Sequence, residues 1–134
     1  MVFPIRIPIE VRFADLDALA HVNNAIYLSY DEIGRTHYIR AMGAIIDGGN
    51  FIMARAEVDF IKPVVMHQHV ELQHRVVQVG NKSFRTLSQL WADGILAART
   101  SVVVVWLENG VPARVPDVIR ERIQALETET VEGL

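Results

Sequence analysis

The stretch DLDALAHVNNAIY, residues 15–27, decides how the rest of the chain is interpreted. It separates a segment in which apolar and polar residues alternate from a longer segment with helical periodicity. Two carboxylates, one imidazole and two carboxamides fall within this short connection. Binding and catalytic groups are disproportionately found on loops that a rigid scaffold holds, so the stretch is the first candidate for a functional site.

Upstream of this stretch, apolar side chains occupy every second position, at Ile5, Ile7, Ile9, Val11 and Phe13. A period of two predicts a strand over residues 5–13 with one buried face. Pro8 has no N–H to donate to a neighbouring strand. The strand should therefore lie at the edge of its sheet or carry a bulge.

Downstream, residues 24–42 contain no proline, and their apolar residues recur with the period of a helix. Two neighbouring stripes, one through Tyr30 and one through Tyr38, are apolar, so this helix is expected to be largely buried. Gly34 lowers helix propensity in the middle of the segment. Its presence predicts that another element packs closely against the helix backbone there.

After a loop at residues 44–50, strands are expected over residues 51–60, 70–79, 83–91 and 95–107. Asp93-Gly94 is typical of a type I′ hairpin turn. Residues 102–105 are apolar on both faces, as in a central strand covered on both sides. A short helix is expected to follow Pro116, and residues 128–134 are expected to be frayed.

This order, one strand, one long helix and then a run of strands, predicts the α+β class. An antiparallel sheet of about five strands must bury one face, and the long helix is the element large enough to cover it. With 134 residues, the chain fits a single domain over residues 1–134 and can bury a core without a disulfide or a metal.

Composition excludes several classes of protein. There is no cysteine, which rules out disulfides, thiolate metal sites and a cysteine nucleophile. The net charge of −3 argues against binding to nucleic acid, which requires concentrated basic surface. The chain shows no signal peptide and no apolar run long enough to span a membrane, so a soluble cytoplasmic protein is expected. Nucleotide-binding glycine motifs and a Gly-x-Ser-x-Gly elbow are also absent.

The spacing of Asp17, His21, Asn23 and Asn24 resembles the Asp…His-Val-Asn-Asn signature of hot-dog-fold acyl-CoA thioesterases of the 4-hydroxybenzoyl-CoA thioesterase-like group. It is similar also to acyl-carrier-protein thioesterases. The resemblance extends over nearly the whole chain and includes the strand-ending segment at residues 60–63. It implies a hot-dog fold, in which a curved sheet wraps around one central helix.

By this resemblance Asp17 is the catalytic carboxylate, acting either as general base for water or as nucleophile on the thioester carbonyl. An aspartate in such a loop also commonly bonds nearby backbone amides, which is the plain structural alternative. Asp15 matches a second acid of the motif, for which we expect a structural role.

One of the two asparagines is expected to cap the long helix, because asparagine is a favoured N-cap residue. A helix N-terminus also presents free N–H groups and a positive dipole end. By the motif match, the backbone N–H of Asn24 is the candidate oxyanion donor. The Asn23 side chain would orient Asp17 or the attacking water.

Further substrate contacts are expected from His21, which shapes the site, and from Tyr27, which together with Tyr30, Phe51 and Met53 is a candidate to line the acyl pocket. In the family, the segment that matches residues 80–85 approaches the CoA phosphates and pantetheine. Lys82, Ser83 and Arg85 are therefore assigned to substrate binding, although a solvated hairpin is the simpler interpretation of that turn.

His67 and His69 share a face of a strand-like segment and raise the question of a metal site. No carboxylate at an obvious spacing completes a ligand set, so we predict neither a metal nor a cofactor.

The sequence thus predicts an acyl-CoA thioesterase that releases a carboxylic acid and a free thiol, with an acyl-carrier-protein thioester as the alternative substrate. The family's sites lie between subunits, which implies a homodimer and often a tetramer. Two alternatives stay open. One is a hot-dog dehydratase acting on hydroxyacyl thioesters, and the other is a non-catalytic acyl-thioester-binding protein, because fold alone does not determine function.

Overall fold

The computed structural model describes residues 1–43 and 50–134, so most of the loop expected at 44–50 lies outside the described residues. The elements follow the predicted order. They are β1 (Ile5–Ile9), the 3₁₀ turn η1 (Phe13–Asp15), α1 (Ile26–Ala41), β2 (Phe51–Phe60), β3 (Val70–Val79), β4 (Ser83–Ala92), β5 (Ile95–Glu108), β6 (Val111–Pro112) and α2 (Asp117–Leu126).

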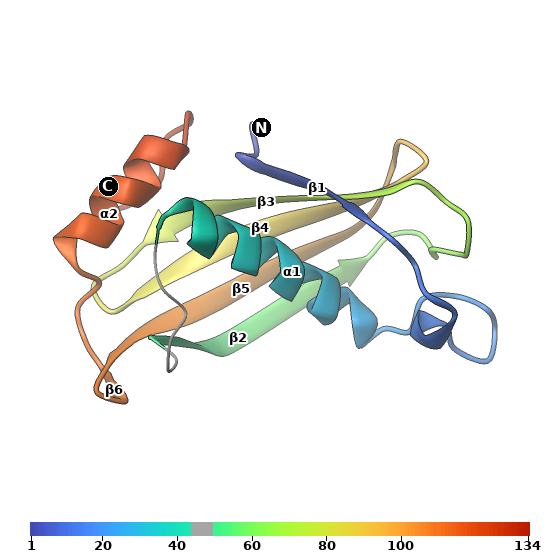
Figure 1. The fold of residues 1–134 in the computed structure, drawn as a ribbon, viewed down its shortest axis with the longest axis horizontal. Coiled ribbons are helices and arrows are strands. Elements are labelled where there is room, and N and C mark those ends of the chain that lie inside the picture. Colours follow the sequence, from blue (N-terminus) through green and yellow to red (C-terminus); the bar gives the residue numbers. More distant parts are fainter. Residues whose placement is uncertain (44–49) are drawn as a thin grey trace.

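The strands form one antiparallel sheet in the order β1-β3-β4-β5-β2, and the two-residue β6 pairs with β5. α1 lies across one face of this sheet (Figure 1). We call this face the inner face and the opposite one the outer face. The arrangement confirms the predicted α+β hot-dog fold, with one long helix against an antiparallel sheet.

β1 is an edge strand, as Pro8 indicated, but it is shorter than predicted. The strand ends at Ile9, and Phe13 falls in η1 with its side chain exposed. The backbone N–H and the guanidinium of Arg12 both donate to the Asp15 carboxylate, and these local hydrogen bonds favour a turn over continued pairing.

α1 is buried along one stripe only, which corrects the expectation of a largely buried helix. The buried stripe includes Tyr27, Tyr30, Gly34 and Tyr38, whereas Ile33 is exposed on the other side. The close approach predicted at Gly34 is confirmed. A Cβ atom on Gly34 would lie 2.7 Å from Leu72 Cδ2 on β3.

Two apolar clusters fill the space under α1, and a polar row across the inner face separates them. The row runs through His74 on β3, Ser88 on β4 and Thr100 on β5. The buried Asp31 carboxylate of α1 accepts a hydrogen bond from Ser88 Oγ at 2.6 Å, and His74 Nδ1 lies 2.7 Å from the same hydroxyl.

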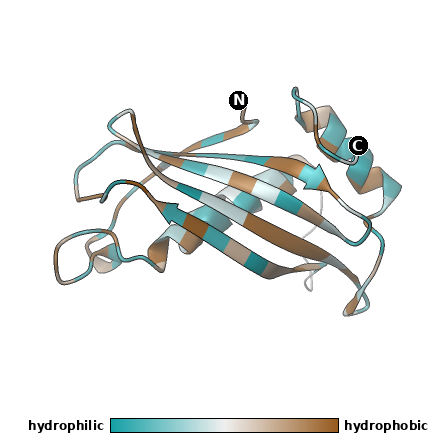
Figure 2. Cartoon of the chain, turned by 180° about the vertical axis from the view of Figure 1, so that it is seen from behind, coloured by the Kyte–Doolittle hydropathy of each residue, from teal (hydrophilic) through white to brown (hydrophobic). Residues whose placement is uncertain are grey.

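β5 is central in the sheet, as predicted, but within the described residues it is covered on one side only. Val102 and Val104 are buried on the inner face. Val103 and Val105 alternate with these residues, so they point to the outer face, and they are half-buried. Figure 2 shows the apolar character of this part of β5.

The prediction that residues 128–134 are frayed was wrong. Val131 is buried, and the backbone around Glu132 pairs with the edge of β3 beyond the point where β1 begins. Glu127 is buried as well and accepts hydrogen bonds from the Tyr38 hydroxyl and the Val76 N–H. The C-terminal segment therefore completes the sheet edge.

Candidate active site

The loop between η1 and α1 closes on itself around Asp17. The Asp17 N–H donates to the His21 carbonyl at 2.7 Å, and Leu16 and Val22 form an isolated bridge. Asp17 Oδ1 accepts hydrogen bonds from the backbone N–H groups of Leu19 at 2.8 Å and His21 at 3.2 Å. The structural role expected of such an aspartate is thus present.

Only one oxygen of Asp17 takes part in these bonds. No described residue donates to Oδ2, and the side chain is exposed. Asp15, two residues earlier, is different because it is buried and both of its oxygens accept hydrogen bonds. Of the two carboxylates, Asp17 is the one that can still accept a proton from water or approach a carbonyl carbon.

The N-terminus of α1 begins close to this carboxylate. Ala25 occupies the position before the first helical residue and makes no side-chain cap. The asparagine cap expected on α1 is therefore not made. Asn23 instead closes the preceding turn, because its Oδ1 accepts from the Ala25 N–H at 3.0 Å and its carbonyl accepts from the Ile26 N–H. Within the described residues the Asn24 N–H has no hydrogen-bond partner.

A cavity of about 220 Å³ brings these groups together with the end of β2. Its lining consists of Asp17, His21, Val22, Asn24, Tyr27, Phe60, Ile61, Lys62 and Pro63. The rings of Tyr27 and Phe60 meet edge to face, with centroids 5.2 Å apart. Burial raises the pKa of Tyr27, and the charge of Asp17 contributes in the same direction.

Four of the predicted site residues therefore line one cavity, namely Asp17, His21, Asn24 and Tyr27. Asn23 lies next to the cavity and closes the turn before α1 rather than lining the cavity. Lys62 was missed as a site residue. The segment 60–63 was recognised in the sequence only as a strand end, yet it supplies one wall of the cavity and its cation.

Within one chain, the lining of this cavity does not include Lys82, Ser83 or Arg85. Ser83 pairs with Val105 at the end of the sheet where β2 begins, whereas the Asp17 cavity lies where β2 ends. Arg85 donates to Gln78 Oε1 at 3.3 Å and lies on the outer face. Ten-residue strands rising about 3.3 Å per residue separate the two ends by roughly 30 Å.

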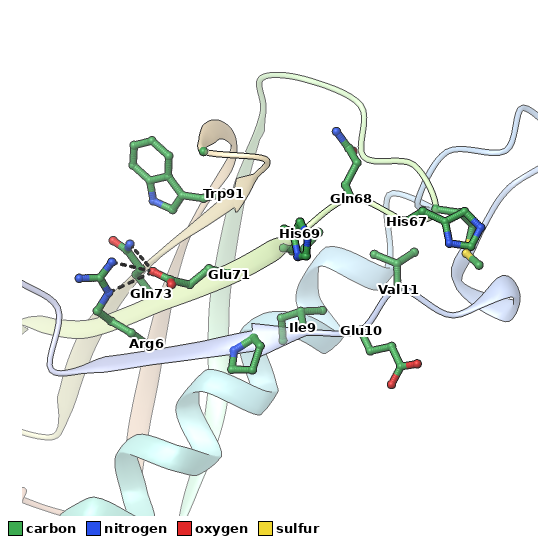
Figure 3. A pocket seen from close by; sticks show the side chains of 14 residues that line it. Arg6, Ile9, Glu10, Val11, His67, Gln68, His69, Glu71, Gln73 and Trp91 are labelled. Carbon is green, nitrogen blue, oxygen red and sulfur yellow. Dashed lines mark hydrogen bonds and ion pairs between the residues drawn. The ribbon is translucent and has the colours of Figure 1, made fainter.

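A larger cavity of about 860 Å³ lies on the outer side, against β1 and the loop that carries His67 and His69 (Figure 3). Glu71 Oε1 accepts there from Arg6 Nε at 3.0 Å and from Gln73 Nε2 at 2.8 Å. Residues 1–43 and 50–134 contain no cluster of three or more His, Cys, Asp or Glu side chains arranged to hold a metal. We place the candidate active site in the smaller cavity, because it has the free carboxylate oxygen and the free amide.

Comparison with known proteins agrees with this fold. The chain belongs to the thioesterase-like superfamily, whose family profile matches residues 11–123. Membership and the matches below make the protein a thioester hydrolase. No curated protein matches the chain.

Among solved structures, the chain is similar to a thioesterase from Thermus thermophilus that was crystallised with coenzyme A and zinc. The two are 43% identical, the alignment covers 96% of this chain and 98% of the other, and the TM-score is 0.92. A 1,4-dihydroxy-2-naphthoyl-CoA thioesterase from Synechocystis is 18% identical, over 89% of this chain and 94% of its own, with a TM-score of 0.78, and it supports the fold alone.

In the described ranges no helix is both long enough and apolar enough to cross a membrane.

Proposed function

We propose that the protein hydrolyses acyl-CoA thioesters with Asp17 as the catalytic carboxylate and the Asn24 N–H as oxyanion donor. The observation that carries this is the presence, in one cavity, of a carboxylate with a free oxygen and a helix N-terminus with a free amide. A carboxylate can activate water or attack the carbonyl carbon itself, and both routes remain open here. A free amide at a helix start stabilises the developing oxyanion.

The reaction would run as an acyl transfer. The Asn24 N–H binds the thioester oxygen, and the carbonyl carbon is attacked either by water deprotonated by Asp17 or by Asp17 Oδ2 directly. Collapse of the tetrahedral intermediate breaks the C–S bond and releases the thiolate, which takes up the proton that Asp17 removed from water or, in the direct route, a proton from solvent. In the direct route, water then hydrolyses the acyl-aspartate. Tyr27 and Phe60 offer an apolar wall to the acyl group.

Coenzyme A is the thiol we favour. The similar Thermus thermophilus thioesterase was solved with coenzyme A, and the chain's own charge of −3 disfavours an acidic carrier protein. Lys82 and Arg85 supply the cations for the CoA phosphates, with Ser83 beside them.

These cations can reach the Asp17 cavity only from a second copy of the chain, which is consistent with a homodimer. β2 is an edge strand that no described strand pairs on its free side. Two such edges related by a two-fold axis perpendicular to the sheet run antiparallel, so the start of one β2 lies beside the end of the other. Residues 82–85 of one copy then lie at the same end of the joined sheet as Asp17 of the other.

Thiol release from a panel of acyl-CoAs tests the proposal, with short, medium, long and aromatic acyl groups at equal concentration. The protein contains no cysteine, so a thiol-reactive dye reports only product. We expect release from at least one acyl class. Formation or loss of an α,β-unsaturated thioester without thiol release would favour the dehydratase alternative, and binding without turnover would favour the non-catalytic one.

A further inference from the structure

The buried Asp15 carboxylate ties the loop to α1. Its Oδ2 accepts from the Arg12 N–H at 3.0 Å and from the Tyr30 hydroxyl at 2.7 Å. Its Oδ1 accepts from Arg12 Nε at 3.1 Å and Nη2 at 2.8 Å. Burial opposes ionisation, but the hydrogen bonds from Arg12 and Tyr30 outweigh it and lower the pKa of Asp15.

The backbone of the same residue closes the loop. The Asp15 carbonyl accepts from the Asn23 N–H at 2.8 Å, and the Val22 N–H donates to the Val64 carbonyl at 2.8 Å. The segment between these anchor points contains Asp17, and its residues 17–20 are exposed. The position of Asp17 relative to α1 therefore depends on the anchor at Asp15, which α1 reaches through Tyr30.

We propose that the Tyr30 hydroxyl is a positioning group for hydrolysis, because through Asp15 it fixes Asp17 relative to the Asn24 amide. This inference rests on the proposed function. The two reacting groups belong to different segments, a loop and a helix, and a misplacement of about 1 Å can cost roughly 100-fold in rate. Tyr30 does not line the Asp17 cavity, which is against the acyl-pocket role considered for it from the sequence, and its hydroxyl bonds to Asp15.

The chain provides a matched control in Tyr38. This residue lies two turns further along α1 and is also buried, and its hydroxyl also donates to a buried carboxylate, Glu127 Oε1, at 2.9 Å. Glu127, however, belongs to the C-terminal segment at the other end of the helix. Tyr38→Phe thus removes the same atom and the same kind of hydrogen bond without touching the loop.

Steady-state thiol release is measured for wild type, Tyr30→Phe and Tyr38→Phe, together with their melting temperatures. For Tyr30→Phe we expect kcat to fall by about tenfold or more with KM within about twofold of wild type, since only transition-state alignment is lost. For Tyr38→Phe we expect a lower melting temperature and a kcat within about twofold of wild type. Asp15→Asn should reproduce the loss of kcat with Tyr30 in place.

Amide hydrogen exchange provides a second readout that does not require activity. The Asn23 and His21 amides, which hydrogen-bond within the loop, should exchange faster in Tyr30→Phe and remain unchanged in Tyr38→Phe. Equal kcat values in the two variants, or unchanged exchange in Tyr30→Phe, would overturn the inference. A wild type that cleaves no thioester would defeat the proposed function instead, and the exchange result would still decide whether Tyr30 anchors the loop.

Discussion

At the scale of single residues, two aspartates two positions apart are placed in opposite environments. Asp15 is buried and saturated with hydrogen bonds, whereas Asp17 is exposed with one oxygen free. Catalytic carboxylates need free lone pairs near the reacting atoms, and structural ones need saturated partners. The motif could be identified in the sequence, but which oxygen remains free depends on the backbone of residues 17–21.

The role proposed for the Asn24 amide leads to a prediction that separates backbone from side chain. Asn24→Pro removes the N–H at the second position of the turn that Asn23 and Ile26 close, where proline is well tolerated. Removing one oxyanion donor should lower kcat by roughly 100-fold. Asn24→Ala keeps the N–H and should retain near-normal kcat, measured as thiol release. Loss of activity in both variants would transfer the role to the side chain.

His74 leads to a prediction about pH and stability. The ring is fully buried between Ser88, Asp31 and the Tyr38 ring, with Arg35 nearby, and burial lowers its pKa to about 3. In the unfolded chain the pKa is about 6.5. Between these two values the unfolded state binds a proton that the folded state does not, so the free energy of unfolding falls as pH falls.

For wild type, proton uptake by His74 in the unfolded chain should therefore lower the free energy of unfolding by about 2 kcal/mol between pH 7 and pH 5. Burial raises the pKa of Asp31, so protonation of Asp31 in the folded state opposes this loss. His74→Asn keeps a donor towards Ser88 and removes the titration. Urea denaturation at pH 7, 6 and 5 should give a flatter pH dependence for the variant. Parallel curves would show that His74 does not titrate on unfolding.

At the scale of elements, periodicity predicted the strands and α1 to within a few residues, because each element's apolar pattern matches the face it buries. The prediction failed where local hydrogen bonds or distant contacts decide. β1 stops early because Arg12 and Asp15 form a turn, and residues 128–134 are ordered because they cover an edge of β3. A polar tail carries no pattern that predicts such a docking.

The docked C-terminal segment leads to a prediction about stability. Deleting residues 128–134 would expose the side chains around Val131 and remove Glu129, which pairs with the buried Arg75. Loss of one buried valine contact and one charged partner should lower the free energy of unfolding by at least about 2 kcal/mol in urea. Met1 and Val2 are exposed but contact Glu129 through their backbone nitrogens, so deleting them should cost only part of this loss. An unchanged midpoint for the longer deletion would contradict the docking.

At the scale of the whole molecule, several apolar surfaces lack a cover among the described residues. Ile33 on α1, Ile52, Met53 and Phe60 on β2, and the outward valines of β5 are all partly or largely exposed. An edge strand with such side chains is a template for pairing with another copy. A second copy paired along β2 accounts for the exposed side chains of that edge strand. Cover for the outward face of β5, which the sequence suggested, would need a further copy, as in a tetramer.

We predict that Ala56→Arg prevents self-association and abolishes activity while leaving the single chain folded. Ala56 is exposed in the middle of β2, so a long cation fits a single chain but not a paired edge. Light scattering at micromolar concentration should give a dimer or larger for wild type and a monomer for the variant. Ala125→Arg, at an exposed position on α2, should behave as wild type. A wild type that is both monomeric and active would contradict an active site shared between two copies.

The measurement that tests the central claim most directly is thiol release by wild type and Asp17→Asn on the best acyl-CoA of the panel. The variant keeps an acceptor oxygen for the Leu19 and His21 amides, so the loop should stay folded, and circular dichroism checks this. The account predicts a fall in kcat of at least about 100-fold. Equal kcat in the two proteins would leave the fold and the family intact and remove Asp17 from the mechanism.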